Sequence, residues 1–205
     1  MKIIEAAKDG NILSLNALIA SGENILEQDE DGRSALHWAA INGHTELVKW
    51  LVQDKGLPID LKDKEGRTAF FESCYEEKWG TASICLNLGA NPNCYVEGTA
   101  PILMAAAFLQ TELIREMLDI KDEYDKQKLD LTVSLKDGEN ALHMAASAST
   151  VHPQINLELV ELLYDHGAPN CIDASNSTPA QYLTGCHDYH FGNEFEIYAK
   201  EHPHD

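Results

Sequence analysis

Histidine is the residue type in this sequence that is best suited to chemistry, because it serves as acid, base and metal ligand near neutral pH. His37 lies in the segment DGRSALHWAA, and His143 lies in the closely similar segment DGENALHMAA. The two histidines therefore occupy the same place in two copies of one pattern. Their role depends on what the repeated pattern builds.

A second group of candidate ligands lies near the end of the sequence. Structural zinc needs four such groups held at fixed geometry. These residues instead form two clusters, separated by a stretch with helical spacing and without paired ligand spacing, so we expect no metal site. They are Cys186, His187, Asp188 and His190, followed by His202 and His204.

Cysteine usage argues against a disulfide framework. The five cysteines are odd in number and irregular in spacing, and no pair forms a C-x-x-C motif that would suggest a zinc knuckle. Reduced, buried thiols are the simplest interpretation, because free cysteine is among the residues most often found in protein interiors. The residues are Cys74, Cys85, Cys94, Cys171 and Cys186.

Sequence motifs of common enzymes are absent. There is no G-x-x-x-x-G-K-[ST] loop, no G-x-G-x-x-G after a strand, no G-x-S-x-G elbow and no H-E-x-x-H helix. The carboxylates lie mostly in turn-like segments, so no pair is assigned to a catalytic cleft. We expect no catalytic residues, no cofactor and no cofactor-binding residues, and therefore a protein that is not an enzyme.

The charge balance is strongly acidic, since 34 Asp and Glu against 15 Lys and Arg give a net charge of −19. Such a surface repels nucleic-acid phosphates and anionic lipid, so we expect no nucleic acid and no membrane among the partners. A basic protein surface is favoured as partner, although solubility alone explains the charge equally well. The sequence has no bilayer-length apolar stretch and no secretory signal, so we expect a cytoplasmic protein.

The sequence repeats itself at intervals of 32 to 40 residues. In each copy a glycine, or an asparagine in the last one, stands where a turn with positive φ is needed. These residues are Gly32, Gly66, Gly98, Gly138 and Asn176. After the turn the apolar residues follow helical spacing, as Leu47, Val48, Leu51 and Val52 do, and this spacing predicts an amphipathic helix.

The best copy runs from Gly32 to Leu51. It is close to the pattern G-x-T-P-L-H-x-A-A-x-x-G-H-x-E-V-V-x-L-L, with Ser34 for threonine and Ala35 for proline. Residues 138–146 match nearly as well. The sequence therefore resembles an ankyrin-repeat protein over residues 2–183, which is most of its length.

The resemblance implies an all-α fold, an ankyrin-repeat solenoid of stacked antiparallel helix pairs with projecting β-hairpin loops. Each pair is too small to bury its apolar face alone, so neighbouring pairs must stack. In this family the histidine at the place of His37 and His143 is structural, because it ties the turn of one repeat to the next repeat by hydrogen bonds. His44 belongs to the family's Gly-His turn and is interpreted in the same way.

A single domain, residues 1–205, is expected. It would comprise an N-terminal capping repeat 1–29, repeats 30–63, 64–95, 96–135 and 136–173, and a partial C-terminal repeat with a capping tail, 174–205. Two insertions, 121–135 and 147–156, are either ornaments or binding elements. In the tail one short helix would cover the last repeat through Phe191, Phe195, Ile197 and Tyr198.

The resemblance also implies a binding surface, the concave face formed by the hairpin tips and the exposed side of each first helix. The tip positions are Asp29, Glu30, Asp31, Arg33, Lys64, Glu65, Arg67, Val96, Glu97, Thr99, Lys136, Asp137 and Glu139. The helix positions are Trp38, Ile41, Asn42, Glu72, Tyr75, Glu76, Met104, Ala107, Phe108 and Met144. Trp38, Tyr75 and Phe108 are candidate anchors, because aromatic residues supply much of an interface's energy. Packing against the adjacent repeat is the alternative role for these three.

The expected function is therefore that of a non-catalytic protein–protein interaction module, a monomer that binds a partner protein with a basic patch through the concave face. Two alternatives stay open. One is a scaffold or inhibitor subunit of another protein. The other is a bacterial or viral effector that acts on a host protein, in which case the host cytoplasm is its location.

Overall fold

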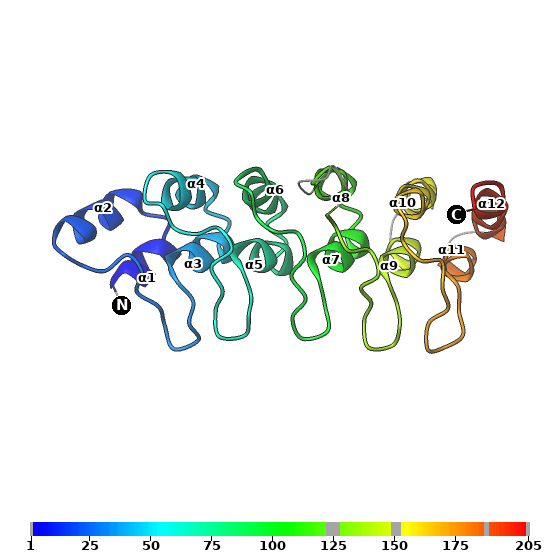
Figure 1. Cartoon of the computed structure of the whole chain (residues 1–205), viewed down its shortest axis with the longest axis horizontal. Helices are drawn as coiled ribbons and strands as arrows, with labels where there is room; N and C mark the ends of the chain where they lie inside the picture. The colour runs from blue at the N-terminus through cyan, green and yellow to red at the C-terminus, as the bar shows by residue number, and fades with distance from the viewer. Residues whose placement is uncertain (1, 122–127, 149–152, 187–188, 204–205) are drawn as a thin grey trace. The chain divides into compact units, whose positions relative to one another are not determined.

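The computed structural model of the chain describes residues 2–121, 128–148, 153–186 and 189–203 (Figure 1). The chain forms two compact units, Met1–Val96 and Glu97–Asp205. The insertion at 121–135, the insertion at 147–156 and the ligand-rich tail each fall partly outside the described residues. None of the helices in the described ranges has the length and apolar composition needed to cross a bilayer.

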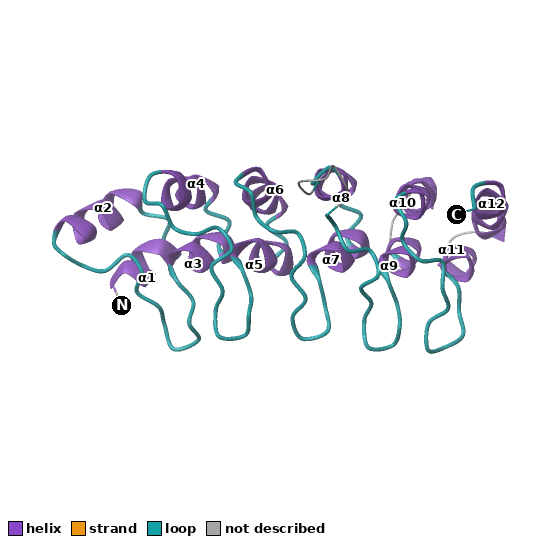
Figure 2. Ribbon diagram, viewed as in Figure 1, coloured by secondary structure: helices purple, strands orange, loops and turns teal. Residues whose placement is uncertain are grey.

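The first unit consists of three helix pairs. Within it, the first helices of the pairs form one layer and the second helices form another, and long loops project beyond the layer of first helices (Figures 1 and 2). The pairs are α1 Lys2–Lys8 with α2 Ile12–Ala20, α3 Ala35–Ile41 with α4 Thr45–Gln53, and α5 Ala69–Tyr75 with α6 Trp79–Asn87.

The second unit repeats this plan with three further pairs. They are α7 Pro101–Ala107 with α8 Thr111–Leu118, α9 Ala141–Ser147 with α10 Pro153–Asp165, and α11 Pro179–Cys186 with α12 Tyr189–Glu201. Across the described residues the β structure is limited to isolated bridge residues, among them the pairs Gln28 with Ser34 and Ser134 with Asn140, and no sheet forms. The expected all-α class of paired helices is thus confirmed.

Hairpin loops are closed by glycine turns. The backbone of Gly32 has φ +80°, and Asp29 N–H donates to Arg33 O at 3.0 Å across the turn. Neighbouring tips also join, because Lys64 N–H donates to Asp31 O at 3.0 Å. A Cβ added to Gly32 would lie 3.0 Å from that Lys64 nitrogen, so the turn needs glycine for two reasons.

The first helices α3, α5 and α9 begin at a polar capping residue, whereas α7 follows Ala100 and has proline at its first position. The Ser34 side chain accepts from Leu36 N–H, and the Thr68 side chain accepts from Phe71 N–H at 3.2 Å. Such caps satisfy amide groups that have no partner within the helix. Because the caps directly follow the glycine turns, they fix where each hairpin gives way to its helix.

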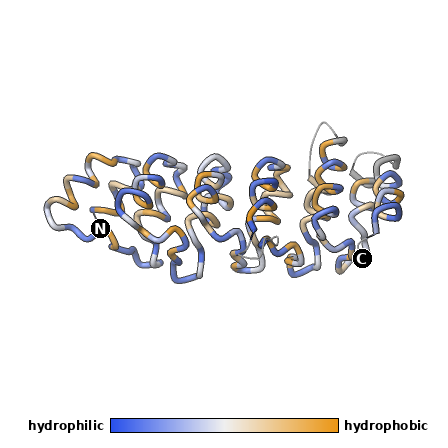
Figure 3. The backbone as a smooth tube through the Cα atoms, turned by 45° about the horizontal axis from the view of Figure 1, so that its top comes forward, coloured by the Kyte–Doolittle hydropathy of each residue, from blue (hydrophilic) through white to orange (hydrophobic). Residues whose placement is uncertain are grey.

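Small and branched apolar residues form the core between the two layers. Leu36, Ala39 and Ala40 of α3 are fully buried, and Leu47 and Leu51 of α4 meet them from the second layer. Figure 3 shows the resulting alternation of hydrophobic and hydrophilic segments along the helices. Alanines on the first helices allow adjacent pairs to approach closely.

The repeated histidines are structural, as expected. The Nε2 atom of His37 lies 3.1 Å from Arg67 O in the next hairpin, and its Nδ1 lies 3.1 Å from Ser34 N. His143 makes the same pair of contacts in the second unit. His44 is also structural, because its Nε2 lies 2.7 Å from Lys8 O.

The C-terminal helix is longer than the short helix expected, and not all of its apolar residues face inward. Phe195 is fully buried and its ring meets Tyr164 edge-on, with centroids 5.7 Å apart. Ile197 is 56% exposed, so its expected packing on the last repeat is wrong. The helix turns its Phe195 and Tyr198 sides to its neighbours, and Tyr198 OH donates to Asp165 at 2.7 Å.

Three other details refine the expectations. Leu129 and Leu131 are buried, so the second part of the 121–135 insertion packs onto its unit. Pro153 stands at the first position of α10, where proline is compatible with a helix. Of the cysteines, Cys171 is exposed, which corrects the expectation of uniformly buried thiols; Cys74, Cys85 and Cys94 are buried.

Candidate protein-binding face

The predicted binding residues of the first unit lie on its hairpin tips and on the outer side of α3 and α5. We call this set the front face of the first unit. Its exposed members are Glu30, Asp31, Asn42, Lys64, Glu65, Tyr75 and Glu76, and its half-buried members are Asp29, Arg33, Trp38, Ile41 and Arg67. Glu72 and Val96 are buried, which corrects their expected exposure.

Trp38 is held in place from several sides. Its indole N–H donates to Asp29 Oδ2 at 2.8 Å. Lys8 Nζ lies 4.4 Å from the ring centroid and Arg33 Cζ lies 5.7 Å from it, which are cation–π distances. Contacts within the unit therefore already occupy much of this side chain.

Glu72 is buried because two arginines from successive hairpins converge on it. Arg33 Nε donates to Glu72 Oε1 at 3.2 Å, and Arg67 Nη1 lies 3.7 Å from the same oxygen. Burial raises the pKa of Glu72, while Arg33 and then Arg67 oppose the rise. Glu72 thus anchors the two arginines and does not offer its carboxylate directly to a partner.

Asp63 is a member of this cluster that the sequence did not single out. Its Oδ1 accepts from Glu65 N–H and Arg67 N–H at 2.9 Å each, which shapes the second hairpin. Its Oδ2 is buried without a hydrogen bond in the described residues and lies 3.8 Å from Arg33 Nε. Arg33 therefore balances two buried carboxylates at once.

A nine-residue spacing between hairpin and helix explains why the Asp63 Oδ2 atom lacks a hydrogen bond in the described residues. The aspartate that opens a hairpin faces the helix residue nine positions later, as Asp29 faces Trp38. In the second unit, Tyr182 OH donates to Asp173 Oδ2 at 2.7 Å in the same way. The residue nine positions after Asp63 is Glu72, an acid instead of a donor. A nine-residue spacing of aspartate and donor is the signal that could have found these residues from the sequence.

Tyr75 is the most accessible aromatic residue of the front face, at 56% exposed. Its ring stacks on Phe71 with centroids 6.2 Å apart and an interplanar angle of 14°. Arg67 Cζ lies 5.9 Å from the ring centroid. The ring is oriented by its neighbours and still open to solvent, so it can contact another molecule without reordering.

The front face of the second unit has a different character. Its aromatic member, Phe108, is 48% exposed, and Met104 and Met144 are half-buried. Glu139 is held by Tyr182 OH at 2.5 Å, a contact that sequence reasoning missed. The remaining members are Glu97, Thr99, Ala107, Lys136 and Asp137, of which Glu97, Lys136 and Asp137 are exposed.

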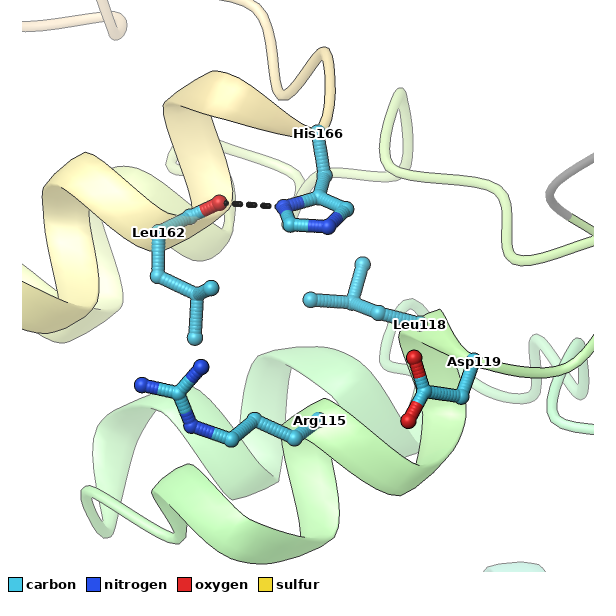
Figure 4. A pocket seen from close by; sticks show the side chains of 5 residues that line it. All are labelled: Arg115, Leu118, Asp119, Leu162 and His166. Atoms are coloured by element: carbon cyan, nitrogen blue, oxygen red, sulfur yellow. Dashed lines mark hydrogen bonds between the residues drawn. The ribbon is translucent and has the colours of Figure 1, made fainter.

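The structure also has hollows whose lining residues are not members of these faces. Figure 4 shows one of about 110 Å³, where Arg115, Leu118 and Asp119 of the α8 end face Leu162 of α10 and His166 just beyond it. His166 Nδ1 lies 2.8 Å from Leu162 O and so caps the end of α10. The hollow is smaller than the roughly 300 Å³ at which ligand pockets begin.

The second hollow, of about 60 Å³, belongs to the first unit. It is lined by Asp60, Lys62, Thr68, Asn91, Asn93 and Cys94. Burial raises the pKa of the Cys94 thiol, which lowers its nucleophilic character at neutral pH. In the described part of the chain, no group of three or more His, Cys, Asp or Glu side chains is arranged to hold a metal ion.

Family models match more than half of this chain. A model of three ankyrin repeats matches residues 3–95, and a single ankyrin repeat matches residues 137–176. The chain is an ankyrin-repeat protein. Its stacked helix pairs, glycine turns and structural histidines are the features of that family seen in the structure.

Known relatives of this ankyrin-repeat protein are distant. The E3 ubiquitin-protein ligase XBAT32 of Arabidopsis thaliana is 27% identical over 189 residues, which are 82% of this chain and 36% of the ligase. The chain thus spans about a third of that relative's length. The match leaves 64% of the ligase uncovered, so the ligase's activity does not follow from it.

Two solved structures share the fold. One is a chain in the complex of the Bd0816 predatory endopeptidase of Bdellovibrio bacteriovorus with the immunity protein Bd3460, with a TM-score of 0.75, 21% identity and coverage of 96% of this chain and 97% of that one. The other is the ankyrin-repeat protein EF0377, with a TM-score of 0.74, 20% identity and coverage of 97% and 96%. At these identities the likeness concerns the fold alone.

Proposed function

We propose that this ankyrin-repeat protein binds another protein through the front face of its first unit, and that the partner presents a basic surface. Ankyrin repeats typically mediate protein binding and are usually non-catalytic. One observation carries the proposal. Tyr75 stands exposed on a face whose exposed acids are Glu30, Asp31, Glu65 and Glu76, against a single exposed lysine, Lys64.

Charge supports the choice of a basic partner. Besides their contacts with buried carboxylates, Arg33 lies 3.7 Å from Asp31 and Arg67 forms an ion pair with Glu65. Glu30 and Glu76 form no ion pair with the described residues, so their charges are the ones most open to a basic partner. Complementary charge speeds association and discriminates between partners more than it adds affinity. The front face of the second unit, with Phe108 and Glu97, is proposed as a second contact region of the same kind.

Affinity capture tests the proposal. The tagged chain captures proteins from the cells that make it, and the double variant Trp38→Ala, Tyr75→Ala is compared with a matched control, Gln53→Ala, Asn87→Ala, on exposed sites of the second helices. The front-face variant should lose the captured protein and the control should keep it, with both variants folded by circular dichroism. Equal capture by both variants would overturn the proposal.

Salt provides a second readout of the captured complex. Raising the salt concentration from about 0.1 M to about 1 M shortens the Debye length from about 10 Å to about 3 Å. The complex should dissociate over this range if a basic surface meets the acidic face. An affinity that is indifferent to salt would contradict the basic partner while leaving protein binding intact.

A second candidate function is an inhibitory subunit, since one structure of the same fold comes from a complex of an endopeptidase with its immunity protein. If the captured partner is an enzyme, adding the purified chain at stoichiometric amounts should abolish its activity. Unchanged activity in the assembled complex would favour a scaffold role over inhibition.

A further inference from the structure

We infer that Tyr75, with Glu76 and Glu77, forms a receptor for an arginine side chain of the partner. The inference rests on the proposed function, because it names the group that the front face of the first unit would recognise. Tyr75 ends α5, and the two glutamates follow it directly. All three side chains are exposed.

The Tyr75 ring is already arranged for a planar cation. Within the unit, the Arg67 guanidinium carbon lies 5.9 Å from the ring centroid, while Phe71 stacks beside the ring and limits its rotation. More than half of the side chain is nevertheless open. A guanidinium of a partner protein would bind to an electron-rich ring that is already ordered in the folded chain, so binding would not lose further side-chain entropy at Tyr75.

Glu76 and Glu77 supply carboxylates without internal counterions. In the described structure neither side chain forms an ion pair, whereas Arg67 is committed to Glu65 and Glu72. The next cation along the chain, Lys78, lays its aliphatic stem against Gly43. An incoming cation therefore meets two exposed glutamates, unpaired in the described structure, that directly follow the exposed Tyr75 along the chain.

The geometry favours arginine over lysine. A guanidinium stacks on an aromatic face through its plane and donates to carboxylates from its edge, whereas an ammonium is a compact, strongly hydrated charge. The Trp38 ring already contacts two cations of the same unit, since Lys8 and Arg33 both lie over it. The Tyr75 ring contacts a single cation of the described residues, Arg67, and Tyr75 remains 56% exposed to an incoming guanidinium.

The backbone adds a constraint on one of the carboxylates. Glu77 has φ +56°, in the left-handed region, where its repeat equivalent is Gly43 with φ +73°. A glutamate at this place costs stability that glycine would not. Leu109, at the same place of the following repeat, has φ +52°, so the protein accepts this cost at more than one repeat.

The test is an NMR titration of the labelled full chain with a blocked tri-arginine peptide, and with tri-lysine at the same ionic strength. Tri-arginine should shift the Tyr75 ring signals and the Glu76 and Glu77 amides in a saturable manner, and tri-lysine should bind more weakly. Tyr75→Ala should weaken tri-arginine binding about two- to fivefold, the range of an exposed cation–π contact. Tyr75→Phe should bind as the wild type does.

Matched controls make the outcome decisive. Tyr95→Ala removes another exposed tyrosine of the first unit and should leave tri-arginine binding unchanged. Glu76→Gln and Glu77→Gln, both at exposed positions, should each weaken it. If tri-arginine shifts Glu30, Asp31 and Glu65 but not Tyr75, or if Tyr75→Ala binds normally, the arginine receptor is refuted while the proposed basic partner survives.

Discussion

Replacing Arg33 by methionine should destabilise the first unit strongly, although Arg33 lies near the surface. Its side chain is 19% exposed, but it faces Glu72 at 3.2 Å and Asp63 at 3.8 Å, whose side chains are only 2% and 1% exposed. Removing one partner of a buried ion pair costs about 3–5 kcal/mol. Arg67 remains 3.7 Å from Glu72 and offsets part of this cost, so we expect about 2–3 kcal/mol, below most of that range.

A second substitution separates this effect from lost packing. Adding Glu72→Met to Arg33→Met removes one of the stranded carboxylates, and an apolar replacement of a buried pair is often neutral or stabilising. The double variant should therefore regain about 1 kcal/mol or more relative to Arg33→Met alone. Such a gain from a second mutation would be hard to explain by side-chain volume.

Urea unfolding followed by tryptophan fluorescence measures both variants. All three tryptophans, Trp38, Trp50 and Trp79, lie in the first unit, so the signal reports on it even if the repeat array unfolds in steps. A loss of less than about 0.5 kcal/mol for Arg33→Met would place the contact among ordinary surface ion pairs. A double variant less stable than either single one would also refute the reasoning.

Three further predictions concern the scaffold. Gly32→Ala and Gly66→Ala both force alanine to positive φ, at a cost of about 1–2 kcal/mol each in unfolding free energy. Only at Gly32 does the Lys64 backbone lie 3.0 Å from the added Cβ, so Gly32→Ala should lose more unfolding free energy than Gly66→Ala. Equal losses in the two variants would count against the close approach of the hairpin tips. Burial lowers the pKa of His37, so unfolding free energy should fall as pH drops below about 6.5, and His37→Gln should flatten that dependence in acid denaturation. The hydrogen bond to Asp165 raises the pKa of Tyr198 to about 12, so stability should decline as pH rises from about 10 towards 12, and an unchanged decline in Tyr198→Phe would contradict this.

Local rules predicted most of the scaffold correctly. Positive φ at Gly32 and Gly66 and the structural contacts of His37 depend on residues within one repeat and its immediate neighbour, which the pattern already contains. The C-terminal helix was also predicted, but the outward direction of Ile197 was not. Its direction depends on how the helix packs on Tyr164, which helical spacing alone does not fix.

The candidate site was harder to predict because its charges pair across repeats. Arg33 and Glu72 are 39 residues apart in sequence, and their contact depends on how the hairpin of one repeat stacks against helix α5 of the next repeat. A position on the outer side of a helix therefore predicted an exposed Glu72, whereas two arginines bury it. Tyr75 is 56% exposed although Arg67 lies over part of its ring, so packing within the unit does not cover it.

Site-specific photocrosslinking tests the central claim, that the front face of the first unit binds a protein, most directly. Benzoylphenylalanine would replace Asn42 or Glu76 on that face and, as matched controls, Gln53 or Asn87 on the second helices, all four being exposed positions. In cells that make the protein, we predict that irradiation gives a heavier adduct from the two front positions and none from the two controls. Adducts from the second helices alone would contradict the claim.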